Sequence, residues 1–116
     1  MASLSAIFLR PPRIVPSVTV EVMSWLARPF HSDGRDGTVS WQEPVAASET
    51  LGRLLERLVN EKPAFRDIYD PESRRVAEHV ELVVNGRIYE LVGGLTYRLH
   101  DGDRVTLFPG YAGGTG

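Results

Sequence analysis

The chain has 116 residues, 42% of them hydrophobic and 24% charged, which predicts a single folded domain with a real core. Thirteen Lys and Arg residues against fifteen Asp and Glu residues give a formal net charge of -2, which argues against nucleic acid as the partner. The sequence has no cysteine, which excludes disulfides, thiolate metal ligands and a cysteine nucleophile and fits the cytoplasmic location that we expect.

Residues 1–16 are expected to form a flexible N-terminal arm, with an added edge strand as the alternative. Pro11, Pro12 and Pro16 interrupt helix formation and strand pairing in this stretch. Arg10 and Arg13 follow its short apolar cluster, whereas a secretory signal carries its basic residues first. No apolar run reaches the roughly 18 residues of a membrane span, so we expect no membrane partner.

The first regular pattern predicts a β-hairpin with a long tip. Val18, Val20 and Val22 alternate with polar or exposed positions, which is typical of a strand with one buried face, and we expect this strand to run to about Leu26. The turn-forming stretch 29–37 comes next. A second short strand is predicted over residues 38–42.

A single amphipathic helix is predicted between residues 48 and 63. Ser48 can cap its first turn and Glu49 would lie where the helix dipole favours an acid. Five apolar residues recur at helical spacing and form one stripe, and Pro63 stops the helix. The stripe, which we expect to lie at the centre of the core, comprises Leu51, Leu54, Leu55, Leu58 and Val59. Phe65, Ile68 and Tyr69 are expected to add a short packed turn.

The second half of the chain predicts another hairpin and a last strand. Asn85-Gly86 separates a strand over residues 80–84 from one over residues 87–91, and this dipeptide is a strong signal for a type I′ turn. Gly93-Gly94 should bend the chain. Residues 101–103, Asp-Gly-Asp, form a turn before a strand over residues 104–108, although the two aspartates could also act as an acidic pair.

Side chains that carry chemistry show no catalytic or metal-binding pattern. His31, His79 and His100 lack metal-ligand spacing, so we interpret them as surface or hydrogen-bonded residues and predict no metal, no cofactor and no catalytic residue. Arg74-Arg75 is read as a solvated face, with anion binding as the alternative. We expect the aromatic residues Trp25, Trp41 and Tyr89 to fill the core, the alternative being a recognition surface.

Three motifs on this order of elements resemble one family. They are residues 83–86 (Val-Val-Asn-Gly), residues 99–109 around Asp-Gly-Asp, and Gly113-Gly114. The chain resembles the ubiquitin-like sulfur carriers of thiamin and molybdopterin biosynthesis. This resemblance implies an α+β, ubiquitin-like β-grasp fold with a mixed sheet packed on one main helix. The β-grasp domain would span residues 17–110, followed by a flexible diglycine tail over residues 111–116.

The resemblance also implies a function for the tail. In this family an adenylating enzyme of the ubiquitin-activating type activates the terminal glycine, which then becomes a thiocarboxylate or is conjugated to a target. The acyl donor here would be Gly114, after removal of Thr115-Gly116 by a zinc metallopeptidase. The residues expected to be recognised along the tail are Pro109, Gly110, Tyr111, Ala112 and Gly113. The partners implied are the adenylating enzyme, the metallopeptidase and a sulfur-accepting or target protein, and the chain itself would be a co-substrate and not an enzyme.

Two other functions stay open at this point. One is a β-grasp module that binds protein or RNA without tail chemistry, and the twelve arginines against one lysine suit bidentate contacts to anions. The other is the small subunit of a complex of the molybdopterin-synthase type, in which the same tail would enter a catalytic partner.

Overall fold

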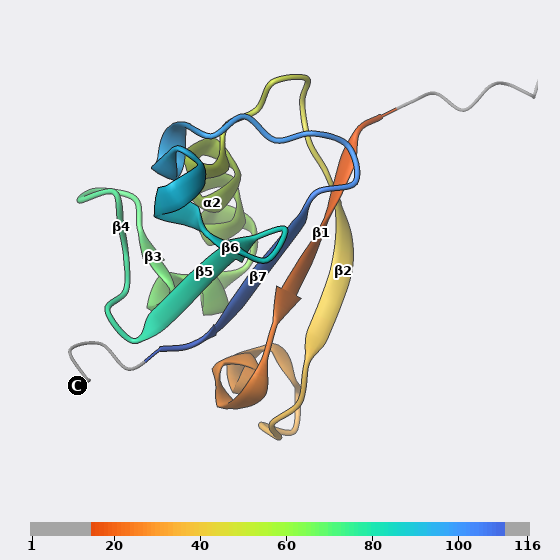
Figure 1. Cartoon of the computed structure of the whole chain (residues 1–116). Coiled ribbons are helices and arrows are strands. Elements are labelled where there is room, and N and C mark those ends of the chain that lie inside the picture. Colours follow the sequence, from red (N-terminus) through yellow and green to blue (C-terminus); the bar gives the residue numbers. More distant parts are fainter. Residues whose placement is uncertain (1–14, 111–116) are drawn as a thin grey trace, which may run out of the picture.

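The computed structural model describes residues 15–110 and contains one mixed five-stranded sheet (Figure 1). In spatial order its strands are β2 (Val39–Pro44), β1 (Ser17–Val22), β7 (Arg104–Pro109), β5 (Val80–Val84) and β6 (Arg87–Ile88). The central pair β1 and β7 is parallel, and the other neighbours are antiparallel. Together with one main helix, this order confirms the predicted α+β, β-grasp fold.

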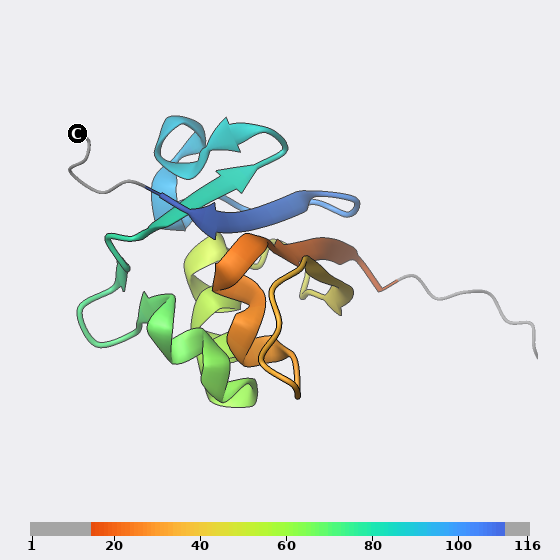
Figure 2. The ribbon, with the colours of Figure 1, turned by 90° about the horizontal axis from the view of Figure 1, so that it is seen from below.

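The remaining elements are one α-helix, four 3₁₀ helices and a small hairpin within the described residues. They are α2 (Leu51–Glu61), η1 (Ser24–Phe30), η2 (Pro63–Asp67), β3 (Tyr69–Asp70), β4 (Arg75–Val76), η3 (Tyr89–Val92) and η4 (Gly94–Thr96). Figure 2 shows that α2, η1 and η2 lie on the same side of the five-stranded sheet. These three helices therefore form the second layer of the domain.

The core lies between the sheet and α2. The predicted apolar stripe of the helix is confirmed, because Leu51, Leu54, Leu55 and Leu58 are 0% exposed and Val59 is 5% exposed. The inward-facing residues of the strands meet this stripe, in the alternation that a sheet with one covered face requires. These residues are Val18, Val20, Val22, Val80, Leu82, Val84, Val105 and Leu107.

The first strand ends earlier than predicted, at Val22 and not near Leu26. Ser24 has a φ of 62°, a left-handed conformation that turns the backbone out of the strand and into η1. Leu26 and Ala27 are both buried in η1, which two successive residues of a strand could not achieve on a single covered face. The prediction was wrong because the alternating pattern does not show where the chain leaves the sheet.

The helix cap also differs from the prediction. Thr50 is the N-cap of α2, and its side-chain oxygen accepts a hydrogen bond from the backbone nitrogen of Arg53 at 3.2 Å. Ser48 instead adopts a left-handed conformation with a φ of 62°. Glu49 lies before the helix, so it does not occupy the first turn. The helix ends at Glu61, and Pro63 begins η2 as its fixed φ allows.

The Asn-Gly hairpin is confirmed, but its second strand is short. Asn85 and Gly86 have φ values of 52° and 84°, the two positive values that a type I′ turn requires. Strand β6 covers only Arg87–Ile88 and the chain then enters η3, whereas a strand to Leu91 was predicted. Leu91 is consequently 74% exposed. As the last strand of the sheet, β6 has a neighbour on one side only, which gives the chain little reason to stay extended.

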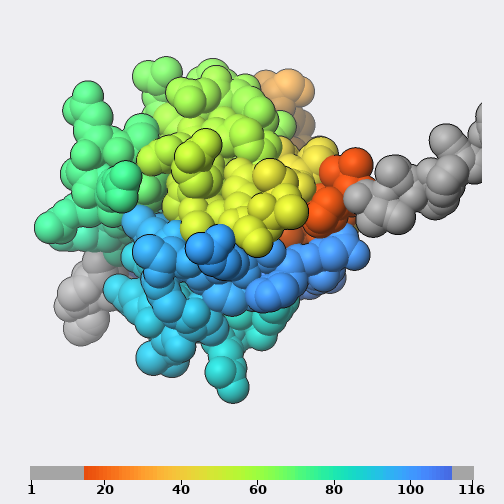
Figure 3. Space-filling model, turned by 90° about the horizontal axis from the view of Figure 1, so that it is seen from above, coloured from red at the N-terminus to blue at the C-terminus, as the bar shows by residue number. Residues whose placement is uncertain are grey.

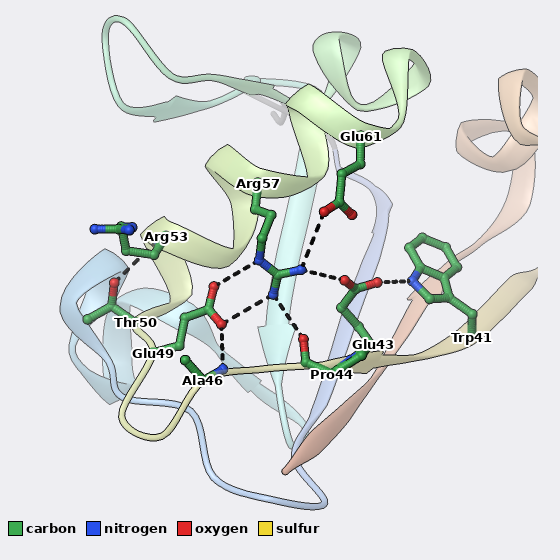
Figure 4. Close-up of polar contacts among 9 residues, drawn as sticks. All are labelled: Trp41, Glu43, Pro44, Ala46, Glu49, Thr50, Arg53, Arg57 and Glu61. Atoms are coloured by element: carbon green, nitrogen blue, oxygen red, sulfur yellow. Dashed lines mark hydrogen bonds and ion pairs between the residues drawn. The ribbon is translucent and has the colours of Figure 1, made fainter. Parts of the chain in front are cut away.

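Arg57 joins α2 to the end of β2 through ion pairs and hydrogen bonds (Figure 4). Its guanidinium donates to Glu43 Oε2 at 2.6 Å, to Glu49 Oε1 at 3.2 Å and to the carbonyl of Pro44 at 3.0 Å. The other carboxylate oxygen of Glu43 accepts from the indole nitrogen of Trp41 at 2.7 Å. The largely buried Glu43 is thereby fully partnered, as a buried carboxylate must be.

The loop before β7 runs along the start of α2, and Figure 3 shows the two segments in contact at this end of the molecule. Backbone bonds hold them together, from the nitrogen of Leu51 to the carbonyl of Tyr97 and from the nitrogen of Leu99 to the carbonyl of Glu49, both at 2.8 Å. The loop therefore fixes where β7 begins.

The predicted N-terminal arm lies almost wholly outside the described residues, and the diglycine tail lies outside them completely. Within residues 15–110, no helix is both long enough and apolar enough to cross a membrane.

Candidate functional site

The candidate site is the point at which the chain leaves the end of β7 (Figure 1). Pro109 is the last residue of this central strand and pairs with Val80 of β5. One residue further, the backbone nitrogen of Gly110 donates to the carbonyl of His79 at 2.8 Å. We call Pro109 and Gly110 the stem. The stem is held on the most enclosed strand of the sheet, so the segment beyond it departs from a fixed point.

The stem runs in close contact with β5. A Cβ added to Gly110 would lie 3.4 Å from both the backbone nitrogen and Oε1 of Glu81. Glycine at this position therefore lets the backbone lie directly against the neighbouring strand. Of the residues predicted to be recognised along the tail, the structure places Pro109 and Gly110 here. Tyr111, Ala112, Gly113 and Gly114 lie outside the described residues.

The outer face of the sheet, opposite α2, is polar on one side and apolar on the other. On the polar side, Glu21 pairs with Arg104 at 2.6 Å and accepts from the hydroxyl of Thr106 at 3.1 Å. The strand registers place Ser40, Glu21, Thr106, Val83 and Ile88 in one row across the five strands. The row thus changes from polar at β2 to apolar at β6.

The apolar side of this face lies near the stem, where Glu81, paired with Phe108, adds one carboxylate to it. Phe108 precedes it on β7, and Met23, whose backbone nitrogen donates to the carbonyl of Leu107, lies beside it. Met23 is 36% exposed and Ile88 is 41% exposed. We call Met23, Phe108, Val83 and Ile88 the apolar face. Exposed apolar surfaces of this kind often mark interaction sites.

The apolar face was not predicted from the sequence. Its members occupy the alternate positions of the same strands whose inward residues were predicted as core. The signal was therefore present, because Val83 and Phe108 are apolar at positions where a one-sided sheet normally carries polar residues.

The aromatic residues have two different fates. Trp41 and Tyr89 are partly buried and pack against the core, as predicted. Trp25 is 43% exposed, so its assignment to the core was wrong. It stands on η1 at the end of the molecule where β7 ends, and its ring stacks on that of His79.

Asp103 organises the turn that precedes β7. Its carboxylate accepts from the backbone nitrogen of His100 at 2.8 Å, from Asn85 Nδ2 at 2.9 Å and from the hydroxyl of Tyr97 at 2.8 Å. Burial opposes the charge, but these hydrogen bonds prevail and hold the pKa of Asp103 below its usual value. Burial and the bond to Asp103 raise the pKa of Tyr97 to about 12.

The other aspartate of this motif also has a structural role. The carboxylate of Asp101 accepts a hydrogen bond from the backbone nitrogen of Ser17 at 2.9 Å. The backbone nitrogen of Gly102 donates to the carbonyl of Ser17 at 2.8 Å. The Asp-Gly-Asp motif therefore ties the start of β1 to the start of β7, which supports its interpretation as a turn. Among residues 15–110, no three His, Asp or Glu side chains are grouped so that they could hold a metal ion.

Comparison with known proteins decides the family. The model of the ThiS family matches residues 35–114, which is more than half of the chain. The chain belongs to the ThiS family. No curated protein sequence matches it. The family assignment confirms the resemblance inferred from the three motifs: this ThiS-family chain is a ubiquitin-like sulfur carrier or modifier.

Solved structures give the same fold for the ThiS-family chain. Urm1 from Trypanosoma brucei is 24% identical and has a TM-score of 0.60, over 89% of this chain and 100% of that one. SAMP1 from Haloferax volcanii is 24% identical with a TM-score of 0.59, over 84% and 99% of the two chains. CysO from Mycobacterium tuberculosis is 27% identical with a TM-score of 0.51, over 78% and 97%.

Proposed function

We propose that this chain is a co-substrate whose acyl donor is Gly114, exposed when a zinc metallopeptidase removes Thr115-Gly116. An adenylating enzyme of the ubiquitin-activating type then joins the Gly114 carboxylate to the α-phosphate of ATP and releases pyrophosphate. Sulfide displaces AMP to form a thiocarboxylate, or an amine of a target protein displaces AMP to form an amide conjugate. The chain supplies the carboxylate, and the partner enzyme supplies the catalytic residues.

The stem is the observation that carries this proposal. Pro109 and Gly110 are fixed to β5, so the tail that begins at Tyr111 starts from a fixed base. Four fully extended residues span about 14 Å at most. That length is enough for the carboxylate to enter a recessed nucleotide site while the domain stays outside. Gly113 and Gly114 have no Cβ and suit a narrow passage.

The extent of the family match supports Gly114 as the donor. The match ends at residue 114, and Thr115 and Gly116 lie beyond it. A carboxylate on Gly116 would stand two residues further from the stem, about 7 Å in an extended chain. A nucleotide site built for the shorter tail would then hold a peptide bond where the carboxylate is required.

ATP–pyrophosphate exchange by the adenylating enzyme of the same organism tests this function. A form ending at Gly114 should support exchange, and the full-length chain should not. Replacement of Gly113 by Trp in the shorter form should abolish exchange and leave the thermal unfolding temperature unchanged. The matched control is the replacement of Ala112 by Trp, which adds the same side chain just before the diglycine. It should reduce exchange less than the replacement of Gly113 does. Equal exchange by the full-length chain would make Gly116 the donor and remove the need for trimming.

A further inference from the structure

A hollow of about 310 Å³ lies between η1, η2 and the start of β5, at the end of the molecule where β7 ends. Apolar and polar side chains from η1 and η2 line it, together with His79 just before β5. The residues that line it are Trp25, Leu26, Arg28, Pro29, Ala64, Asp67, Ile68 and His79. None of them belongs to the stem or to the apolar face of the sheet.

Trp25 forms one wall of the hollow without serving the core. It is 43% exposed, and its ring stacks on the exposed ring of His79 with centroids 6.0 Å apart and planes 17° apart. The preceding residue, Ser24, has the left-handed φ of 62°, which residues with a side chain seldom adopt. The turn at Ser24 buries Leu26 and Ala27 but leaves the large ring of Trp25 partly in solvent, beside the hollow.

The lining of the hollow is mainly apolar. Its charged members are Arg28, whose guanidinium is bonded to the carboxylate of Asp36, and Asp67, whose side chain is exposed. Leu26 and Ile68 are buried beneath it, and Pro29 and Ala64 add apolar surface. An apolar side chain fits such a pocket, because the ring of Trp25, Pro29 and Ala64 would remove its apolar surface from water.

The hollow is directly connected to the stem. His79, which lines it, accepts the hydrogen bond from Gly110 through its backbone carbonyl. A protein that holds the stem is therefore already against one wall of the hollow.

We propose that this hollow, the η1 pocket, receives an apolar side chain of the enzyme that adenylates the tail. Naming that enzyme as the partner rests on the function proposed above. The occupant is a leucine, methionine or phenylalanine, placed against Trp25 while the tail occupies the nucleotide site. The η1 pocket is then a second anchor that selects the cognate enzyme, in the way that buried aromatic residues dominate many interfaces.

Pyrophosphate exchange with the form ending at Gly114 tests the η1 pocket. Replacing Trp25 by Ala should raise the KM for the carrier roughly tenfold, the scale of a strong interface residue, and leave kcat unchanged. Leu91→Ala is the matched control, since it removes an even more exposed apolar side chain at the far edge of the sheet. Thermal unfolding should show that both variants are folded. An unchanged KM for Trp25→Ala would overturn the proposal.

A second substitution identifies the occupant. Ala64→Asp places a carboxylate inside the η1 pocket, so an apolar occupant predicts a KM at least ten times higher. A lower KM would mean that the occupant is a basic side chain and would overturn the proposal as stated.

Direct binding separates this proposal from the proposed function. Indole N–H signals of Trp25 and Trp41 can be followed by NMR while the adenylating enzyme is added without ATP. The Trp25 signal should shift or broaden at lower enzyme concentration than that of Trp41, whose N–H is bonded to Glu43. If the chain supports no exchange but Trp25 responds, the tail chemistry fails and the pocket stands. If exchange occurs and Trp25 does not respond, the pocket fails alone.

Discussion

The guanidinium of Arg57 lies 2.6 Å from the carboxylate of Glu43 and so connects the middle of α2 to the end of β2. The carboxylate side chain is only 9% exposed and that of the arginine 31%. Removing the arginine would leave a largely buried negative charge with the indole of Trp41 as its remaining side-chain partner. The pair is therefore more important than a surface salt bridge would be.

We expect Arg57→Ala to lower the free energy of unfolding by about 2 kcal/mol, less than for a fully buried pair because water reaches the guanidinium. Urea denaturation measures the change. The control is Arg53→Ala, which removes an exposed arginine of the same helix and should cost under about 0.5 kcal/mol. Equal losses in the two variants would show that the pair with Glu43 adds nothing beyond helix propensity.

Leu55 is 0% exposed in the centre of the helical stripe, so its truncation should create a cavity. Leu55→Ala is expected to cost about 2 to 5 kcal/mol of unfolding free energy. Leu91→Ala provides the comparison at an exposed site and should change stability by no more than about 0.5 kcal/mol. A loss within experimental error for Leu55→Ala would contradict the packing of α2 on the sheet.

Asp103 should make the protein sensitive to acid. Because hydrogen bonds hold its folded pKa below the unfolded value, its contribution to stability is complete above the unfolded pKa of about 3.9. The contribution is lost as the pH falls from there through the lower folded pKa. The neutral variant Asp103→Asn should be less stable at pH 6 and should lose less stability between pH 5 and pH 2.5. Parallel pH profiles of urea midpoints would rule out this role.

The apolar face predicts a second class of adenylation defect. Met23→Glu introduces a charge beside the stem and should raise the KM for the carrier in pyrophosphate exchange several-fold, with kcat unchanged. Ser40→Glu places the same side chain on the polar side of the same sheet face and should have no effect. Similar KM values for the two variants would show that the partner does not cover this face.

Protein isolated from its native cells should contain a form that ends at Gly114 as a thiocarboxylate. Intact-mass analysis would detect the loss of Thr115 and Gly116 together with the replacement of one oxygen by sulfur. Treatment with an alkylating reagent should modify this form, since the chain has no cysteine that could react in its place. Finding only chains that end at Gly116 would contradict the trimming step.

Much of this protein is determined locally by its sequence. The stripe from Leu51 to Val59 fixes a helix and its buried face, because helical spacing alone brings those residues together. Asn85-Gly86 fixes a hairpin because only a few residues tolerate two successive positive φ values. The three motifs, in their order along the chain, were also sufficient to predict the family, because that prediction uses residue types and spacing and no distances in space.

Tertiary structure alone decided the features that depend on distant segments. The end of β1 is set by the burial of Leu26 and Ala27, and the role of Arg57 by a carboxylate fourteen residues away on another element. Trp25 has a large aromatic side chain that is typical of a core residue, yet the fold leaves it exposed beside His79, which is distant in sequence. Such outcomes follow from which surfaces the packed layers cover, and a local pattern carries no information on that.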